Sequence, residues 1–190
     1  MAIDTGLQVG CTDLQATGGV RQIIVTELTN IDTVTLGSSH DYTNLTTASA
    51  AARFEFKNES ASLSINGTKE NGSTSFEIGL SWTIPNIQAS AFNQLKDLQD
   101  ACMVAVVELN SGKKLVIGMS DAFGNKGVDA NAWDRNQTYA TLGGFEGGSG
   151  AAFSDENGIT VSLTCKQYEL PREYTGAITV LAGDVTASLA

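Results

Sequence analysis

The sequence predicts a mainly β domain, an antiparallel sandwich or barrel-like fold with one short α-helix packed on a sheet. Three observations predict it: an unbroken polar–apolar alternation at residues 75–84, a change to helical spacing directly afterwards, and Asn-Gly turns between apolar runs. With 190 residues, 20 Gly and 2 Pro, the chain has the length and composition of one sheet-rich domain spanning residues 1–190.

The alternating run gives a strand two different faces. A period of two over ten residues is typical of a strand with one buried and one wet side. The apolar set consists of Phe76, Ile78, Leu80, Trp82 and Ile84. The polar set consists of Ser75, Glu77, Gly79, Ser81 and Thr83. Pro85 ends the run.

An amphipathic helix is expected between about residues 88 and 101, because Phe92, Leu95, Leu98 and Cys102 recur at helical spacing. This stripe should pack on the apolar face of the preceding strand. The predicted helix–sheet core is therefore Phe76, Ile78, Leu80, Trp82, Phe92, Leu95 and Leu98.

A second strand is expected at residues 53–65, with an irregularity inside it. Phe54 and Phe56 share one parity, whereas Leu63 and Ile65 share the other. The apolar face therefore switches near residues 58–61, which indicates a bulge or a passage between two packing environments.

This strand and residues 73–84 should form a long antiparallel hairpin, because Asn66-Gly67 and Asn71-Gly72 bracket a polar turn between them. Apolar runs predict further strands at residues 20–28, 103–109, 114–119 and 159–165. Residues 1–19 are expected to be an N-terminal arm, and the polar tracts 29–52 and 121–150 to be long inter-subunit loops.

Charge and cysteine content exclude several classes. The chain has 11 basic and 21 acidic residues, a net charge of −10, and no basic stripe that would bind nucleic acid through salt links. Cys11, Cys102 and Cys165 lie far apart, which predicts buried thiols in a reducing compartment. No signal peptide and no membrane-spanning run are expected.

Catalytic chemistry is hard to find, and neither an enzyme nor a cofactor or metal is expected. The single histidine, His40, has no local partners for a triad. The acidic residues near Asp129 and Asp134 lack the spacing of a calcium loop. The run Gly143–Gly150 lacks the Lys-Ser/Thr of a phosphate loop and is expected to be a flexible loop.

The order of elements from Ser73 to Met119 resembles the core of phage tail tube proteins. That family shares its fold with the inner tubes of contractile injection machines and of the type VI secretion system. The resemblance is carried by the strand end LSWTIP (80–85), the helix AFNQLKDL (91–98), the hairpin MVAVVELNSGKKLVIG (103–118) and the later turn and strand DENGITVSL (155–163).

The resemblance implies a structural, self-assembling virion protein, made in the host cytoplasm and located in the tail. Six copies would form a ring whose sheets join into one β-barrel, and rings would stack into a tube that conducts DNA without binding it specifically. The lumen-facing residues would be Ser75, Glu77, Ser81 and Thr83. Expected partners are further copies of the chain and other tail proteins, such as the terminator, tape measure, and baseplate or distal tail proteins, with no membrane involved.

An alternative from another class stays open. Trp133 and Tyr139, beside the acidic loop, have the chemistry to stack on a sugar. The chain would then be a β-sandwich carbohydrate-binding or capsid-decorating module.

Overall fold

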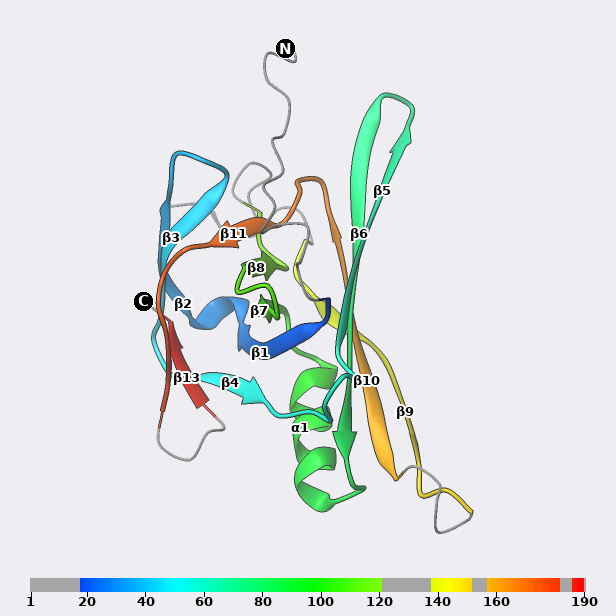
Figure 1. The fold of residues 1–190 in the computed structure, drawn as a ribbon. Coiled ribbons are helices and arrows are strands. Elements are labelled where there is room, and N and C mark those ends of the chain that lie inside the picture. The colour runs from blue at the N-terminus through cyan, green and yellow to red at the C-terminus, as the bar shows by residue number, and fades with distance from the viewer. Residues whose placement is uncertain (1–17, 121–137, 152–156, 182–185, 190) are drawn as a thin grey trace.

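The computed structural model describes residues 18–120, 138–151, 157–181 and 186–189 and is mainly β, as the sequence predicts. Two sheets and one helix make up this part of the chain (Figure 1). A nine-stranded sheet curls on one side of the molecule, and a four-stranded sheet stands beside it with the helix against its inner face (Figure 1).

The nine-stranded sheet has the order β12-β13-β4-β1-β7-β8-β11-β3-β2. All of its pairs are antiparallel except β11 with β3. It curls far enough for β13 to contact β3, so that it forms a half-barrel. Its strands are β1 (Val20–Glu27), β2 (Ile31–Leu36), β3 (Asp41–Thr47), β4 (Ala51–Phe54), β7 (Met103–Leu109), β8 (Lys114–Ile117), β11 (Arg172–Tyr174), β12 (Ile178–Val180) and β13 (Thr186–Leu189), and a 3-10 turn, η2 (Leu28–Asn30), joins β1 to β2.

The four-stranded sheet is antiparallel throughout, with the order β5-β6-β10-β9. Its strands are β5 (Ser62–Glu70), β6 (Ser73–Pro85), β9 (Thr141–Gly148) and β10 (Gly158–Gln167). Helix α1 (Ala89–Gln99) follows β6 directly. Within the described residues, no helix has the length and apolar character needed to cross a membrane.

Two apolar cores share the central strands β1 and β7. Ile23 and Val107 belong to the core between the two sheets, whereas Ile24 and Val106 belong to the core inside the half-barrel. These strands are buried on both faces, which explains their nearly continuous apolar sequences.

The predicted helix–sheet core is largely confirmed. Ile78, Leu80, Trp82, Leu95 and Leu98 are all buried in the core between the sheets. Phe76 is only half-buried, because its partner on β5 is Gly67, in the exposed part of the β5–β6 hairpin. Phe92 was expected in this core but is 51% exposed.

The buried side of the helix keeps the predicted Leu95 and Leu98 but begins at Ala91 instead of Phe92. Ala91, Leu95 and Leu98 form the buried side of α1, at i, i+4 and i+7. Phe92 lies about 100° further around the helix. The expectation of a buried thiol is also wrong for Cys102, which follows the helix and is exposed, while Cys165 is buried as predicted.

The predicted loop at residues 29–52 is wrong, because its greater part forms the hairpin of β2 and β3. Val34, Tyr42 and Leu45 anchor this hairpin in the half-barrel core. The loop predicted at 121–150 is wrong over residues 141–148, which form β9, and residues 121–137 lie outside the described part of the chain. Of the predicted arm, residues 1–17 also lie outside it.

The predicted switch of apolar parity near residues 58–61 marks a passage between sheets. Instead of one strand from Arg53 to Ile65, the chain forms β4 in the nine-stranded sheet and β5 in the four-stranded sheet. The turn of the β5–β6 hairpin is Asn71-Gly72, with φ of 49° and 83°, as a type I′ turn requires. Asn66 and Gly67 lie within β5 instead.

Candidate functional site: the hydroxyl face of the four-stranded sheet

The two faces of the four-stranded sheet differ sharply in chemistry. One face is apolar and packs on α1 and the nine-stranded sheet. The opposite face carries mostly small polar side chains from all four strands. We call it the hydroxyl face; its members are Ser62, Ser64, Asn66, Thr68 and Glu70 of β5, Ser73, Ser75, Glu77, Gly79, Ser81 and Thr83 of β6, Thr160, Ser162, Thr164 and Lys166 of β10, and Thr141, Gly144 and Glu146 of β9.

The strand register aligns the hydroxyls in rows across the sheet. Ser62, Ser81 and Ser162 are direct partners in one row, and Thr83 and Thr160 are partners in another. The hydroxyl oxygens of Ser62 and Ser81 lie 3.0 Å apart, and those of Thr83 and Thr160 lie 3.1 Å apart. Each hydroxyl has one donor and two acceptor sites, so a single bond to a neighbour leaves capacity for water.

Two further hydroxyls turn back onto the sheet itself. Ser64 Oγ donates to the carbonyl of Gly79 at 3.3 Å, and Ser162 Oγ donates to the carbonyl of Gly144 at 3.1 Å. These bonds hold the side chains close to the backbone. The result is a surface of short, polar and mostly uncharged side chains, with few long projecting groups.

Formal charge on the hydroxyl face is sparse and net negative. Glu77 of β6 lies directly opposite Lys166 of β10, so the only cation of this face has a carboxylate as its neighbour. Glu146 on β9 and Glu70 at the end of β5 add two more carboxylates. The face therefore carries no row of cations that would hold phosphate groups.

All four residues predicted to face the lumen lie on this face. Glu77 is exposed, and Ser75, Ser81 and Thr83 are partly exposed. Sequence reasoning did not assign the members on β5, β9 and β10. The signal for β10 was present, since Ser162 and Thr164 alternate with apolar residues in the strand predicted at 159–165.

The edges of the four-stranded sheet are β5 and β9, and the strands between them are staggered in one direction. β5 pairs with residues 73–81 of β6, β10 pairs with residues 76–85, and β9, traced through β10, lies level with residues 79–85. Each strand is thus displaced by about one to two residues from the previous one. With a rise of about 3.3 Å per residue and a distance of about 4.8 Å between strands, this displacement corresponds to strands tilted by about 35–55° from the axis of a barrel. Strands in closed barrels are tilted by about 35–45°.

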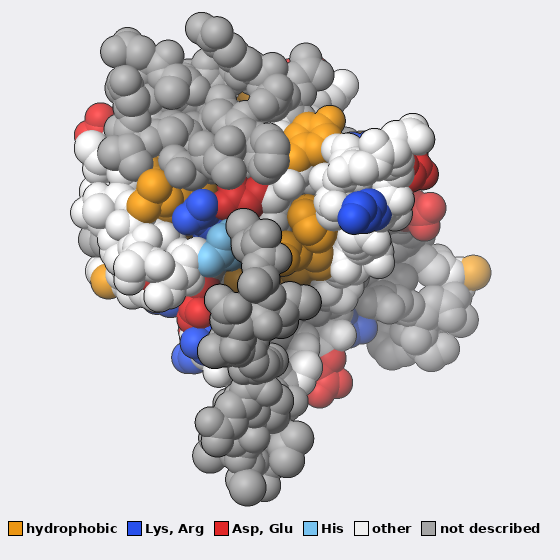
Figure 2. Space-filling view, turned by 90° about the horizontal axis from the view of Figure 1, so that it is seen from above, with side chains coloured by type: hydrophobic (Ala, Val, Ile, Leu, Met, Phe, Trp, Pro, Cys, Tyr) orange, Lys and Arg blue, Asp and Glu red, His pale blue; other side chains and the backbone are white. Residues whose placement is uncertain are grey.

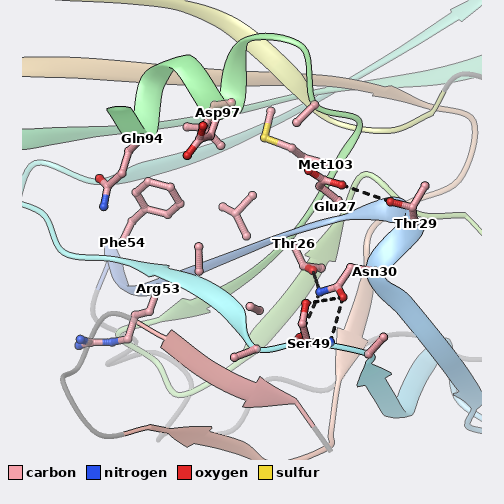
Figure 3. A pocket seen from close by; sticks show the side chains of 17 residues that line it. Thr26, Glu27, Thr29, Asn30, Ser49, Arg53, Phe54, Gln94, Asp97 and Met103 are labelled. Carbon is pink, nitrogen blue, oxygen red and sulfur yellow. Dashed lines mark hydrogen bonds between the residues drawn. The ribbon is translucent and has the colours of Figure 1, made fainter. Parts of the chain in front are cut away.

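A cavity of about 530 Å³ lies elsewhere, between α1, β1 and β4 (Figure 3). Three of its polar side chains bind one another: Asn30 Nδ2 donates to Thr26 Oγ1 at 2.8 Å, and Ser49 Oγ donates to Asn30 Oδ1 at 2.7 Å. A binding pocket typically contains a few polar groups that point into the cavity and can bind a ligand. The pairing of these three side chains gives no such signal.

His40 belongs to a polar cluster in which the carboxylate of Glu169 lies between the other side chains. Ser120 Oγ donates to Glu169 Oε2 at 2.7 Å, and Glu169 Oε1 lies 3.8 Å from His40 Nδ1 and 2.6 Å from the guanidinium of Arg172. The order serine–carboxylate–histidine differs from the nucleophile–base–acid order of hydrolytic triads. A structural ion pair accounts for the geometry.

The remaining predicted ligand groups give no site. In the described part of the chain, no cluster of three or more His, Cys, Asp or Glu side chains could hold a metal ion. Asp129, Asp134 and Trp133 lie outside the described residues. Tyr139, the other aromatic of the carbohydrate alternative, packs against the half-barrel core.

No family model, curated protein or solved structure matches the chain.

Proposed function

We propose that the protein is a phage tail tube subunit, a structural protein whose copies assemble into rings that stack into a DNA conduit. The observation that carries the proposal is the hydroxyl face. It extends over four strands, and the opposite side of the same sheet is a conventional core. In a tube wall built from this sheet, the apolar face would pack against the rest of the subunit and the hydroxyl face would contact water.

The chemistry of the hydroxyl face suits a surface along which DNA slides. Proteins hold DNA chiefly by neutralising phosphates with Lys and Arg. On this face the one lysine, Lys166, lies opposite Glu77. The other basic side chains visible from the hairpin end of the molecule are scattered and form no stripe (Figure 2). A net charge of −10 per copy would add repulsion between the conduit and its cargo.

The topology of the four-stranded sheet suits ring closure. β9 runs antiparallel to β5, so a ring of copies related by rotation would bring antiparallel edges together at every subunit boundary. Six copies would supply 24 strands, which at a spacing of about 4.8 Å and a tilt of about 40° make a barrel about 50 Å across. With small side chains on the inner wall, this bore is wider than a DNA double helix.

Electron microscopy of the purified chain over a range of protein concentrations and ionic strengths tests the proposal. We expect rings with a central opening, and stacked tubes at high concentration. Analytical ultracentrifugation of the same samples should show one large closed species in equilibrium with monomer. A protein that stays monomeric under every condition would rule the proposal out.

A further inference from the structure

The two edge strands of the four-stranded sheet each expose a large apolar side chain on the same face. Phe145 on β9 is 55% exposed, and Ile65 on β5 is 40% exposed. Phe145 pairs with the buried Val161, and Ile65 pairs with the buried Ile78, so both project on the core side of the sheet. Apolar side chains at both edges favour association of one edge with the other.

Each edge strand also carries a glycine on that face beside its exposed apolar residue. Gly67 follows Ile65 by two positions on β5, and Gly147 follows Phe145 by two positions on β9. A Cβ added to Gly67 would lie 3.1 Å from the ring of Phe76, so that ring already covers the glycine from its own chain. Aromatic rings that cover glycines on neighbouring strands stabilise sheets.

The stagger of the sheet selects a register for such an edge contact. If β5 of a second copy is added at the β9 edge with the same displacement between neighbouring strands, its central residue, Asn66, lies level with residues 146–147 of β9. Directly paired residues project on the same face, and Asn66 and Glu146 are both on the hydroxyl face. Asn66 therefore falls opposite Glu146. The flanking pairs are then Gly67 with Phe145 and Ile65 with Gly147.

We infer that β9 of one copy pairs with β5 of a second copy in this register, with Phe145 over Gly67 and Ile65 over Gly147. The inference rests on the proposed ring and specifies how its subunits join. Each large side chain is then paired with a glycine, so the opposing residue adds no side chain of its own; the neighbours on the same face are Phe76 beside Gly67 and Ile159 beside Gly147. On the other face, Asn66 and Glu146 continue the polar wall across the boundary.

Disulfide trapping tests the register. In a chain with Cys11→Ser and Cys102→Ser, we expect Asn66→Cys with Glu146→Cys to give a ladder of covalent oligomers after mild oxidation. Directly opposed residues have Cβ atoms about 4.5–5.5 Å apart, close to what a disulfide needs. The slipped pairs Ser64→Cys with Glu146→Cys and Thr68→Cys with Glu146→Cys should cross-link at least tenfold more slowly.

A second measurement tests the role of Phe145. Phe145→Ala should raise the critical concentration for ring assembly at least tenfold, while the monomer keeps its thermal midpoint. Phe92→Ala removes an equally exposed ring from α1 and serves as the matched control, with assembly unchanged. Rings that trap a slipped pair faster, or that tolerate Phe145→Ala, would overturn the register alone; a wild-type chain that forms no ring would overturn the proposed function with it.

Discussion

The ring of Phe54 lies 5.3 Å from the ring of Trp82, tilted by 54°, and this pair joins the two sheets. Phe54 ends β4 of the nine-stranded sheet, and Trp82 lies toward the C-terminal end of β6 in the four-stranded sheet. Tilted aromatic pairs at this separation add attraction beyond the area that they bury. The contact fixes the position of the hydroxyl face relative to the rest of the molecule.

Trp82→Ala should lower the free energy of unfolding by about 3–5 kcal/mol, because the side chain is fully buried and its removal leaves a cavity. Trp82→Phe should cost clearly less. The buried indole N–H of Trp82 has no hydrogen-bond partner among the described residues, so the phenyl ring loses volume but no polar contact. Urea titration followed by circular dichroism measures both variants; equal costs would contradict the cavity argument.

Gly118→Ala should be among the most damaging single-methyl changes in the chain. Gly118 has φ of 85°, and an added Cβ would lie 2.5 Å from the carbonyl oxygen of Met103. Gly112→Ala is the control, because Gly112 has φ of 83° but no atom within 4 Å of the added Cβ. The control should lose about 1 kcal/mol from the backbone conformation alone, and Gly118→Ala should lose more. Similar thermal midpoints for the two variants would refute the close approach.

Glu169→Ala should destabilise the protein by about 3 kcal/mol, because it leaves the guanidinium of Arg172 partly buried without its carboxylate. The control is Lys113→Ala at the pair of Lys113 with Glu173, whose side chains are 65% and 38% exposed. An exposed pair contributes about 1 kcal/mol or less. Chemical denaturation compares the two variants, and an equal loss would mean that burial of Glu169 has no energetic effect.

The stability of the protein should fall as the pH rises above about 9. Burial raises the pKa of the Cys165 thiol from 9.0 to about 12, against a smaller lowering by a hydrogen bond with the Gly118 backbone. Above pH 9 the unfolded chain therefore releases a proton that the folded chain retains until about pH 12, which favours unfolding. Cys165→Ala should remove this part of the pH dependence, as measured by urea titrations at pH 8 and pH 10.5; an unchanged slope would count against it.

The same buried thiol predicts a difference in reactivity. At pH 8, Cys102 should react with a thiol reagent in the native protein, whereas Cys165 should react only after unfolding. Mass spectrometry of labelled peptides separates the two sites. Rapid native labelling of Cys165 would show that the region around it opens on the time scale of the reaction.

Lysines on the hydroxyl face should slow DNA passage through assembled tubes. Ser81→Lys with Thr83→Lys places two cations on the wall while the core side of β6 is unchanged, so we expect folding and assembly to persist. Thr33→Lys with Thr35→Lys, at two exposed positions of β2, is the control for added charge. DNA retention by the wall variant should decrease steeply with salt. Tubes of the wall variant that eject DNA at the normal rate would show that this face does not line the lumen.

The parts of the fold that the sequence predicts are those specified by local periodicity. The alternation around Trp82 and the helix that follows are both present at the expected positions. The hairpin of β2 and β3 was not predictable in this way, because its residues are mostly Thr, Asn and Asp. Its place in the sheet depends on the pairing of Tyr42 with Tyr174, which are 132 positions apart in the sequence.

The hydroxyl face likewise has a part that local periodicity predicts and a part that depends on strand pairing. Ser81 and Thr83 follow from the pattern of one strand, whereas the rows to which they belong require the register of β5 and β10. β9 was the least predictable, because glycine has a low strand propensity and the run Gly143–Gly150 was expected to be a flexible loop. Pairing with β10 along its length makes residues 141–148 a strand.

The pairing of β13 with β4 and of β11 with β3 bears on when the chain can fold. The half-barrel cannot be completed until residues up to Leu189 have left the ribosome, because these late strands pair with residues 41–52. Sheets built from such distant contacts fold slowly, on the scale of milliseconds to seconds. We therefore expect nascent chains to remain incompetent for assembly until β13 has been synthesised, so that subunit joining begins only after this strand is available.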